Sequence, residues 1–256
     1  MNGLALCSGF GGIERGLESR IDGFKTVCHV EGEAYAVANL VKKIQEGAIH
    51  DAPVWSNVQT FDGKPWRGKV DIITGGFPCQ PHSSAGKLLG EKDPRNLWPD
   101  VKRIIGEVSP RFLFLENVSN INNTIGPSIV GDLAQMGFDA AWCVVRASDV
   151  GAPHRRARWF IMAIANTDRQ RTQRPGVKLR PRALFKRYID AESIESRRFE
   201  DWWAVEPPVG RMVDGVAHWV DRLRGCGNGV VPQQAAYAFD ILSTALMNHE
   251  SKTATL

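Results

Sequence analysis

Short apolar runs alternate with amphipathic stretches along the first 165 residues, and this alternation constrains the fold more than any other feature of the chain. Apolar runs of about five residues without polar alternation are typical of strands buried on both faces of a sheet, and amphipathic stretches are typical of the helices that cover it. The pattern therefore predicts a layered α/β domain. Strands, most of them buried on both faces, are expected at residues 3–7, 26–30, 70–74, 112–115, 141–145 and 159–163, and helices at 12–19, 33–45, 97–108, 129–136 and 233–247.

Length and composition restrict the class of protein further. A chain of 256 residues is expected to form one large domain with at most a small appendage, and 43% hydrophobic with 23% charged residues excludes a disordered or collagenous protein. No stretch has the roughly 20 apolar residues needed to cross a bilayer and no signal peptide begins the chain, so a cytoplasmic protein without a membrane partner is expected. The five cysteines form no CxxC pair, which predicts neither a disulfide framework nor a metal site.

Positive charge is concentrated between residues 166 and 200. This segment has ten Lys or Arg and five Asp or Glu, whereas the whole chain carries a net charge of only +4. The apolar periodicity fades here while Arg, Pro and Ser accumulate, so the segment is expected to be an insert that binds nucleic-acid phosphates. A solvated loop is the alternative that charge alone leaves open.

A glycine-rich turn, CSGFGG at residues 7–12, follows the first predicted strand and precedes the first predicted helix. Glycines there let the backbone approach a ligand, and the helix N-terminus offers unpaired N–H groups. Further along, Glu31 ends the next apolar run, where a carboxylate can accept hydrogen bonds from a ribose diol. The two features together predict a nucleoside-type cofactor, and a purely structural turn is the alternative for the glycines alone.

Cys79 lies in a polar loop, GGFPCQPHSSAGK at residues 75–87, directly after the predicted strand 70–74. The carboxyl ends of strands form the rim at which open α/β sheets place their sites. A thiol with an ordinary pKa of about 8.5 becomes a good nucleophile where dipoles or cations favour the thiolate. A reactive thiol is therefore favoured over the alternative of a small buried residue, whereas Cys7, Cys28, Cys143 and Cys226 are expected to pack.

Charged side chains mark the ends of two further predicted strands. The run FLFLENV ends in Glu116 and Asn117, where partial desolvation would raise the pKa of the carboxyl towards that of a working acid; a helix or turn cap is the alternative. In GAPHRRARWF, Arg156 and Arg158 alternate on one face and suit phosphate, carboxylate or a base carbonyl oxygen, with a surface ion pair as the alternative. His154 has no Cys or His companions at metal spacing and is interpreted as a hydrogen-bonding residue.

These motifs, taken together and in this order, resemble those of the DNA (cytosine-5)-methyltransferases of bacterial and phage type. The blocks are CSGFGG, PCQ, ENV, HRRAR and RLRGCGNGVVPQQA, and the resemblance covers about residues 3–165 and 202–240. It implies a Rossmann-like α/β fold of the S-adenosylmethionine-dependent methyltransferases, with a mostly parallel seven-stranded sheet, helices on both faces and a small target-recognition insert. The expected parts are a catalytic and cofactor-binding domain over residues 1–165, a short basic target-recognition region over 166–205, and a C-terminal element over 206–256 that completes the catalytic domain.

The resemblance also implies the reaction, which is transfer of a methyl group from S-adenosyl-L-methionine to C5 of a flipped cytosine in duplex DNA, without a metal. Cys79 would attack C6 covalently, Glu116 would bind N3, and Arg156 and Arg158 would organise the base and the catalytic loop. Cofactor contacts are expected from Gly9, Phe10, Gly11, Gly12, Ile13, Glu31, Asn57, Val58, Pro78, Leu97, Asn228 and Val230. DNA contacts are expected from Gln80, Ser83, Ser84, Lys87, Arg180, Arg182, Lys186 and Arg187.

Four positions depart from the pattern of the family. Cys7 stands where most members have Phe, Gly32 where an aromatic residue often stacks on adenine, and Asn57 where Asp is usual. These differences are expected to weaken or reshape adenine binding without removing the ribose contact at Glu31. His154 replaces the usual Gln of the arginine motif, while both arginines remain.

Two other functions remain open from the sequence. The same chemistry on RNA is one, and a catalytically idle DNA-binding or regulatory protein with an altered adenine pocket is the other. The expected enzyme is a monomer, with a restriction endonuclease as a further candidate partner. No residue is identified as the base that removes the C5 proton, and bound water is the default.

Overall fold

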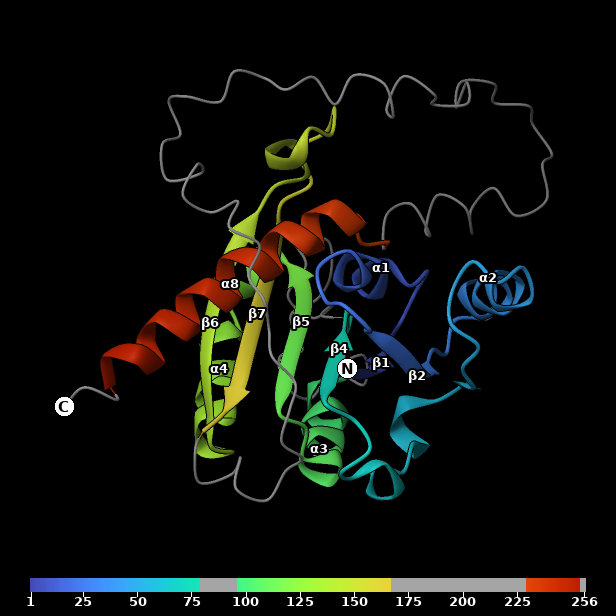
Figure 1. Cartoon of the computed structure of the whole chain (residues 1–256), viewed down its shortest axis with the longest axis horizontal. Coiled ribbons are helices and arrows are strands. Elements are labelled where there is room, and N and C mark those ends of the chain that lie inside the picture. The colour runs from blue at the N-terminus through green and yellow to red at the C-terminus, as the bar shows by residue number, and fades with distance from the viewer. Residues whose placement is uncertain (79–95, 167–228, 254–256) are drawn as a thin grey trace.

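The computed structural model describes residues 1–78, 96–166 and 229–253, and the structural statements below concern these residues. They form a seven-stranded sheet in the order β3-β2-β1-β4-β5-β7-β6 (Figure 1). All pairings from β3 to β5 are parallel, and only β7 runs antiparallel to its neighbours. The mostly parallel seven-stranded sheet expected from the sequence is therefore confirmed. The strands are β1 Asn2–Leu6, β2 Lys25–Val30, β3 Val54–Trp55, β4 Ile72–Gly75, β5 Phe112–Val118, β6 Phe138–Val145 and β7 Arg158–Ala165.

Each of the six predicted strand ranges overlaps an observed strand. No range was expected at β3, because a strand of two residues is too short to carry an apolar pattern. The expectation of burial on both faces is wrong for the run at 141–145. This run lies in β6 at the edge of the sheet, where Trp142 and Val144 are 48% and 46% exposed.

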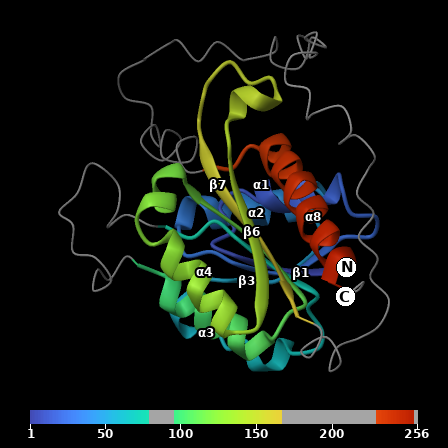
Figure 2. The same ribbon diagram turned by 90° about the vertical axis from the view of Figure 1, so that its left-hand side faces the viewer.

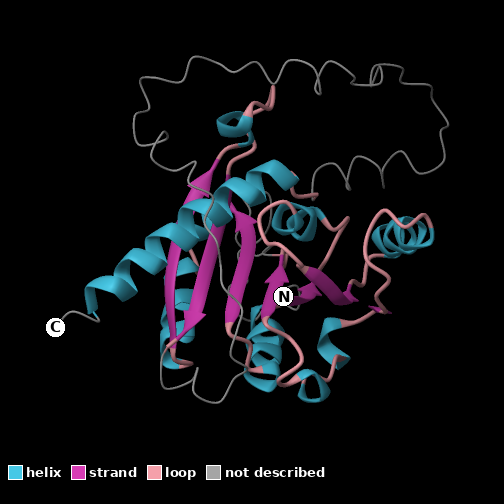
Figure 3. Ribbon diagram, viewed as in Figure 1, coloured by secondary structure: helices cyan, strands magenta, loops and turns pink. Residues whose placement is uncertain are grey.

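The helices cover both faces of the sheet. Figure 2 shows α1 and α8 on one side and α3 and α4 on the other, and the same layers are visible by element type in Figure 3. The α-helices are α1 Gly12–Glu18, α2 Ala34–Gln45, α3 Trp98–Val108, α4 Gly126–Gln135 and α8 Pro232–Thr253, and the 3-10 helices are η1 Val58–Thr60, η2 Lys64–Trp66, η5 Ser119–Asn123 and η6 Ala147–Val150.

The apolar period of α3 explains how a helix is fixed on the sheet. Val101, Ile104, Ile105 and Val108 recur at helical spacing and are fully buried in the core between the sheet and the helices α3 and α4. The helix ends at Ser109, whose left-handed φ of 53° stops the helical path. A second core, on the opposite face, packs α1 and α8 against β5 and β7.

Two glycines of α1 allow α8 to pack closely. A Cβ at Gly12 would lie 2.3 Å from the Val230 carbonyl oxygen, and a Cβ at Gly16 would lie 2.6 Å from the Pro232 carbonyl oxygen. Because backbone atoms cannot move aside as a flexible side chain can, both positions require glycine. The start of α8 is thus held directly against the helix that follows the glycine-rich turn. Within the described residues, no helix is long and apolar enough to cross a membrane.

The topology brings the predicted motifs to one end of the sheet, across the ends of several strands. The parallel strands β1, β2, β4 and β5 all end there, and β7 begins there because it is antiparallel. Val118 at the end of β5 therefore pairs with Arg158 at the start of β7. Figure 2 shows the β6–β7 hairpin extending beyond the rest of the sheet, with η6 at its tip.

Candidate active site

The glycine-rich turn between β1 and α1 is ordered by Glu31. One carboxylate oxygen accepts the Gly9 N–H at 2.7 Å and the other accepts the Glu33 N–H at 2.8 Å. The turn needs left-handed backbone at Cys7, Gly9 and Gly11, with φ values of 49°, 54° and 74°. Glu31 thus connects the end of β2 to the turn, and each of its oxygens keeps a second lone pair for a ligand.

A second side of the same turn is held by α2. The Lys43 ammonium donates to the Phe10 carbonyl oxygen at 2.7 Å and also lies 5.8 Å from the centre of the Phe10 ring. The Phe10 ring packs edge-on against Tyr35, with their centres 6.1 Å apart. Partial burial lowers the pKa of Lys43. Nothing in the sequence pattern singles out Lys43, since a lysine on an amphipathic helix is ordinarily solvated.

Glu116 lies at the end of β5, where it is buried and paired with Arg158. The Nε of Arg158 is 2.9 Å from Oε1 of Glu116. Burial raises the pKa of Glu116 to about 7, although Arg158 and Arg156 both lower it. A carboxyl with this pKa is available both as acid and as base near neutral pH. Gly76 leaves room beside it, because a Cβ there would lie 3.1 Å from Oε2 of Glu116.

Arg156 is held in an unusual backbone conformation by the C-terminal segment. Its φ is 29°, and its guanidinium donates to the carbonyl oxygen of Gly229. The amide of Gln234, in the first turn of α8, donates to the carbonyl oxygens of Arg156 at 2.9 Å and Val145 at 2.8 Å. Gln234 is fully buried, so it fixes the base of the β6–β7 hairpin from α8. The motif RLRGCGNGVVPQQA includes Gln234, but the sequence gives it no role of its own because that role depends on a contact 78 residues away.

The loop that leads to Cys79 begins next to Glu116. The buried amide of Asn117 donates to the Phe77 carbonyl oxygen at 2.8 Å, and Phe77 packs against Trp98 with ring centres 5.6 Å apart. Pro78 follows and is exposed. Cys79 itself lies outside the described residues. Asn117 therefore holds this loop at Phe77, which is two residues before the predicted nucleophile Cys79.

A second buried carboxyl, Glu14, lies on α1. The Thr74 hydroxyl donates to its Oε1 at 2.6 Å, while Oε2 has no hydrogen-bond partner among the described residues. Burial raises the pKa of Glu14 to about 7. No motif of the sequence analysis included Glu14.

The described cysteines have thiols that ionise with difficulty. Burial raises the pKa of Cys7 to about 12, with Glu31 and Asp100 adding to the effect, and burial raises the pKa of Cys28 to about 11 and of Cys143 to about 12. Such thiols are poor nucleophiles near neutral pH.

The remaining predicted cofactor residues lie around the end of the sheet at which β1, β2, β4 and β5 finish. Asn57 precedes η1 and its side chain accepts the Gln59 N–H, whereas the Val58 side chain is buried in the core next to α3. Leu97 precedes α3, and Ile13 lies in the core under α1. The predicted residues outside the described part of the chain are Cys79, Gln80, Ser83, Ser84, Lys87, Arg180, Arg182, Lys186, Arg187 and Asn228.

The sheet order, with one antiparallel strand and a glycine-rich turn after β1, defines the Rossmann-like fold of S-adenosylmethionine-dependent methyltransferases. Residues 1–201 match the family model of C-5 cytosine-specific DNA methylases. The chain therefore belongs to the family of C-5 cytosine-specific DNA methylases.

Individual relatives show how much of the family's length is present. The chain is 32% identical over 257 residues to Type II methyltransferase M.CviJI of Paramecium bursaria Chlorella virus IL3A, which covers 98% of this chain and 61% of that protein. It is 32% identical over 167 residues to Type II methyltransferase M.NgoMIV of Neisseria gonorrhoeae, covering 64% of this chain and 51% of that protein. The chain thus spans less than two thirds of the length of these relatives.

Two solved structures resemble the described fold. A substituted DNMT2 of Spodoptera frugiperda has a TM-score of 0.53 and 26% identity over 65% of this chain and 50% of that chain. A putative DNA modification methyltransferase encoded within an E. coli prophage has a TM-score of 0.51 and 27% identity over 64% of this chain and 47% of that chain.

Proposed function

We propose that this chain is a DNA (cytosine-5)-methyltransferase that uses S-adenosyl-L-methionine as methyl donor and duplex DNA as substrate. One observation carries the proposal: Glu116, paired with Arg158, lies at the end of β5 beside the turn that leads to Cys79. A buried carboxyl with a pKa of about 7 next to a thiol-bearing loop supports proton transfer coupled to nucleophilic attack.

The edge of the sheet fits the methyl donor. A side chain at Gly9 would meet no described atom within 4 Å, so the backbone of the glycine-rich turn borders open space next to the carboxylate of Glu31. When bound, the donor supplies an electrophilic methyl group on a sulfonium. We assign its contacts to Gly9, Phe10, Gly11, Gly12, Ile13, Glu31, Asn57, Val58, Pro78, Leu97, Asn228 and Val230.

Cytosine C5 is a poor nucleophile until the ring gains electrons. In the proposed reaction the Cys79 thiolate forms a bond to C6, and Glu116 donates a proton at N3 so that the electron pair is not left as an anion. C5 then takes the methyl group, whose bond to the sulfonium sulfur breaks and leaves a neutral thioether. Water, as the default base, removes the C5 proton; the electron pair restores the C5–C6 double bond and the thiolate leaves. N3 returns its proton to Glu116, which regenerates the acid. Arg156 and Arg158 orient the base, and Arg158 also holds the Glu116 carboxyl.

The substrate must leave the double helix before this reaction. Unstacking one nucleotide costs a few kcal/mol, which contacts to the DNA must offset. We assign these contacts to the loop residues Gln80, Ser83, Ser84 and Lys87 and to the basic residues Arg180, Arg182, Lys186 and Arg187. The proposal places a monomer in the cytoplasm, with a restriction endonuclease as candidate partner.

Transfer of tritium from the methyl donor to duplex DNA tests the proposal. The wild-type chain is expected to label cytosine C5, and Cys79→Ser is expected to give no label, because a hydroxyl does not form the bond to C6. Cys143→Ser is the control and is expected to retain activity. Label at adenine N6 or cytosine N4, or preferential labelling of RNA, would overturn the proposal.

A further inference from the structure

The segment that follows β3, residues 56–63, carries Asn57 and Val58 but is weakly attached to the sheet. β3 has two residues, and the hydrogen bonds that join it to β2 include His29 N–H to Pro53 at 2.9 Å and Glu31 N–H to Trp55 at 2.8 Å. A pocket of about 310 Å³ lies beside it, lined by Cys28, Pro53, Val54, Trp55, Thr60, Phe61, Asp62, Pro65 and Trp66. Val58 and Phe61 are buried in the core, but because the packing leaves this cavity, other contacts also set the position of the segment.

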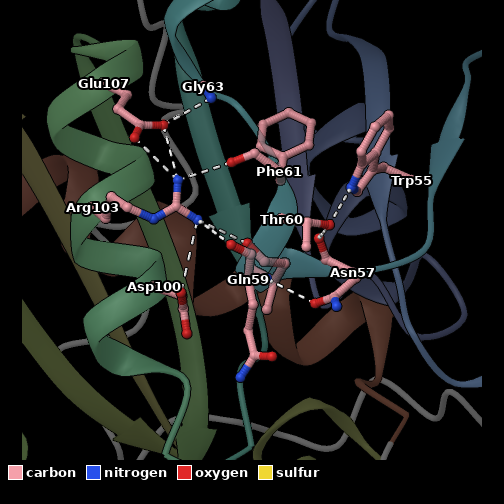
Figure 4. Close-up of polar contacts among 10 residues, drawn as sticks. Trp55, Asn57, Gln59, Thr60, Phe61, Gly63, Asp100, Arg103 and Glu107 are labelled. Atoms are coloured by element: carbon pink, nitrogen blue, oxygen red, sulfur yellow. Dashed lines mark hydrogen bonds and ion pairs between the residues drawn. The ribbon is translucent and has the colours of Figure 1, made fainter.

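Arg103, in the middle of α3, supplies these contacts. Its guanidinium donates to three backbone carbonyl oxygens of the segment: Phe61 at 2.9 Å, Val58 at 3.0 Å and Gln59 at 3.2 Å (Figure 4). A planar guanidinium has five N–H donors in a fixed arrangement, so it can hold several carbonyls in one geometry, which an ammonium cannot do. We call Arg103, Glu107 and these three carbonyls the Arg103 cluster.

Acidic residues on α3 fix the guanidinium itself. Both oxygens of Glu107 accept from Arg103 at 3.1 Å, and Asp100 lies 3.7 Å away on the preceding turn (Figure 4). Glu107 also accepts the Gly63 N–H at 2.8 Å, so the cluster holds both ends of the segment. The three charged side chains occupy one face of α3 at helical spacing, which keeps Arg103 extended towards the segment.

We propose that Arg103 is a positioning residue for the adenine side of the methyl-donor site. This inference rests on the proposed function, which assigns Asn57, Val58 and Leu97 to the donor. Leu97 directly precedes α3, and Val58 is bonded to α3 through Arg103. The cluster therefore fixes Val58 relative to Leu97, and with them the width of the site that receives the adenine.

A second arginine gives a matched control. Arg67 follows η2 and links the chain between β3 and β4 to α3. Its guanidinium donates to the carbonyl oxygens of Glu107 and Gly106 at the end of the helix, both at 2.9 Å. Like Arg103, Arg67 donates from its guanidinium to backbone carbonyl oxygens, but in no described contact does it touch residues 57–61. Loss of Arg67 should therefore report the general effect of weakening the packing of α3.

The experiment compares binding of S-adenosyl-L-homocysteine by the wild type, Arg103→Gln, Arg103→Lys and Arg67→Gln, measured by calorimetry. Arg103→Gln is expected to raise Kd at least about tenfold, Arg103→Lys less, and Arg67→Gln less than about twofold. Methyl transfer at saturating donor is expected to change less than about threefold in Arg103→Gln, so that KM for the donor and not kcat carries the defect.

Amide hydrogen exchange of the donor-free protein supplies a readout that does not depend on the reaction. Peptides that cover residues 57–63 are expected to exchange faster in Arg103→Gln than in Arg67→Gln, whereas peptides of β1 remain unchanged. Equal loss of binding in both arginine variants, or unchanged binding in Arg103→Gln, would overturn the inference alone. A wild-type chain that binds no S-adenosyl-L-homocysteine would instead overturn the proposed function, and the inference with it.

Discussion

At the scale of single residues, the two buried carboxyls of this chain show how environment sets chemistry. Glu116 and Glu14 both have a pKa raised to about 7 by burial. Glu116 has a guanidinium partner, whereas among the described residues the side-chain partner of Glu14 is the Thr74 hydroxyl. Both shifts make stability depend on pH, and for Glu116 the shift also supports proton transfer.

We expect Arg158→Gln to raise the pKa of Glu116 further. Burial raises this pKa and Arg158 lowers it, so removal of the guanidinium leaves burial less opposed. The measurement is the infrared carboxyl band of protonated Glu116 between pH 5 and 9, identified by its loss in Glu116→Gln. Arg155→Gln, at an exposed neighbouring position, is the control and should leave the midpoint unchanged. A midpoint in Arg158→Gln at or below that of the wild type would contradict the prediction.

We expect Glu14→Gln to change how stability varies with pH. The pKa of Glu14 is about 7 in the fold against an ordinary 4.5, so between these values the folded chain binds more protons than the unfolded chain. The free energy of unfolding therefore falls as pH rises from 4.5 to 7 and levels off above 7, by an upper bound of roughly 3 kcal/mol.

Urea unfolding at pH 5 and pH 8 measures this difference. The wild type should lose more stability between the two pH values than Glu14→Gln, which cannot titrate at this position. Because the glutamine leaves an amide group in an apolar site, its absolute stability is not the readout. Asp22→Asn, an exposed carboxyl, should behave as the wild type does. Parallel curves for the wild type and Glu14→Gln would show that Glu14 is not the group responsible.

At the scale of elements, α8 connects the end of the described chain to the arginine hairpin. Its first turn packs against Gly16 of α1, Val230 just before it packs against Gly12, and its Gln234 contacts the backbone of Arg156. One helix thus positions both the glycine-rich turn and a predicted catalytic arginine. A change in the first turn of α8 should therefore affect the site without any contact to Glu116.

We expect Gln234→Leu to lower the rate of methyl transfer about tenfold in single turnovers while leaving DNA binding unchanged. The leucine removes both donors, so that the carbonyl oxygens of Arg156 and Val145 lose their partner and Arg156 loses its fixed position. Unsatisfied buried groups of this kind also cost about 1–3 kcal/mol of stability. Gln233→Leu, at the exposed neighbouring position, is the control. Equal rates for the two variants would exclude a positioning role for Gln234.

The sequence predicts the elements that have a local pattern and misses those fixed by distant contacts. The strands β2 and β5 contain apolar runs, so the sequence predicts their positions together with the carboxyls of Glu31, after β2, and Glu116, near the end of β5. β3 has two residues and no pattern, and the exposure of Trp142 follows only from the place of β6 at the edge of the sheet. Arg103, Gln234 and Lys43 donate to backbone carbonyl oxygens far away in the chain. Because every residue has such a carbonyl, the residue types do not identify these acceptors.

At the scale of the whole molecule, charge is divided unevenly. Residues 166–200 have five more basic than acidic residues while the chain carries +4, so the remainder is close to neutral. The candidate site carries a smaller excess, the two guanidiniums of Arg156 and Arg158 against the single carboxyl of Glu116. Attraction to the DNA backbone is therefore expected to come mainly from this basic segment and not from the site.

We expect combined replacement of Arg180, Arg182, Lys186 and Arg187 by glutamine to weaken DNA binding equally for every sequence and to reduce its salt dependence. Each phosphate contact contributes a slope of about −0.9 in log K against log salt, so loss of four contacts makes the slope shallower by roughly 3 to 4. The measurement is DNA binding by fluorescence anisotropy from 50 to 200 mM salt. Replacement of four exposed lysines outside the segment (Lys25, Lys42, Lys64 and Lys69) is the control, since it removes the same charge. If both variants shifted the slope equally, net charge and not the basic segment would explain the attraction to DNA.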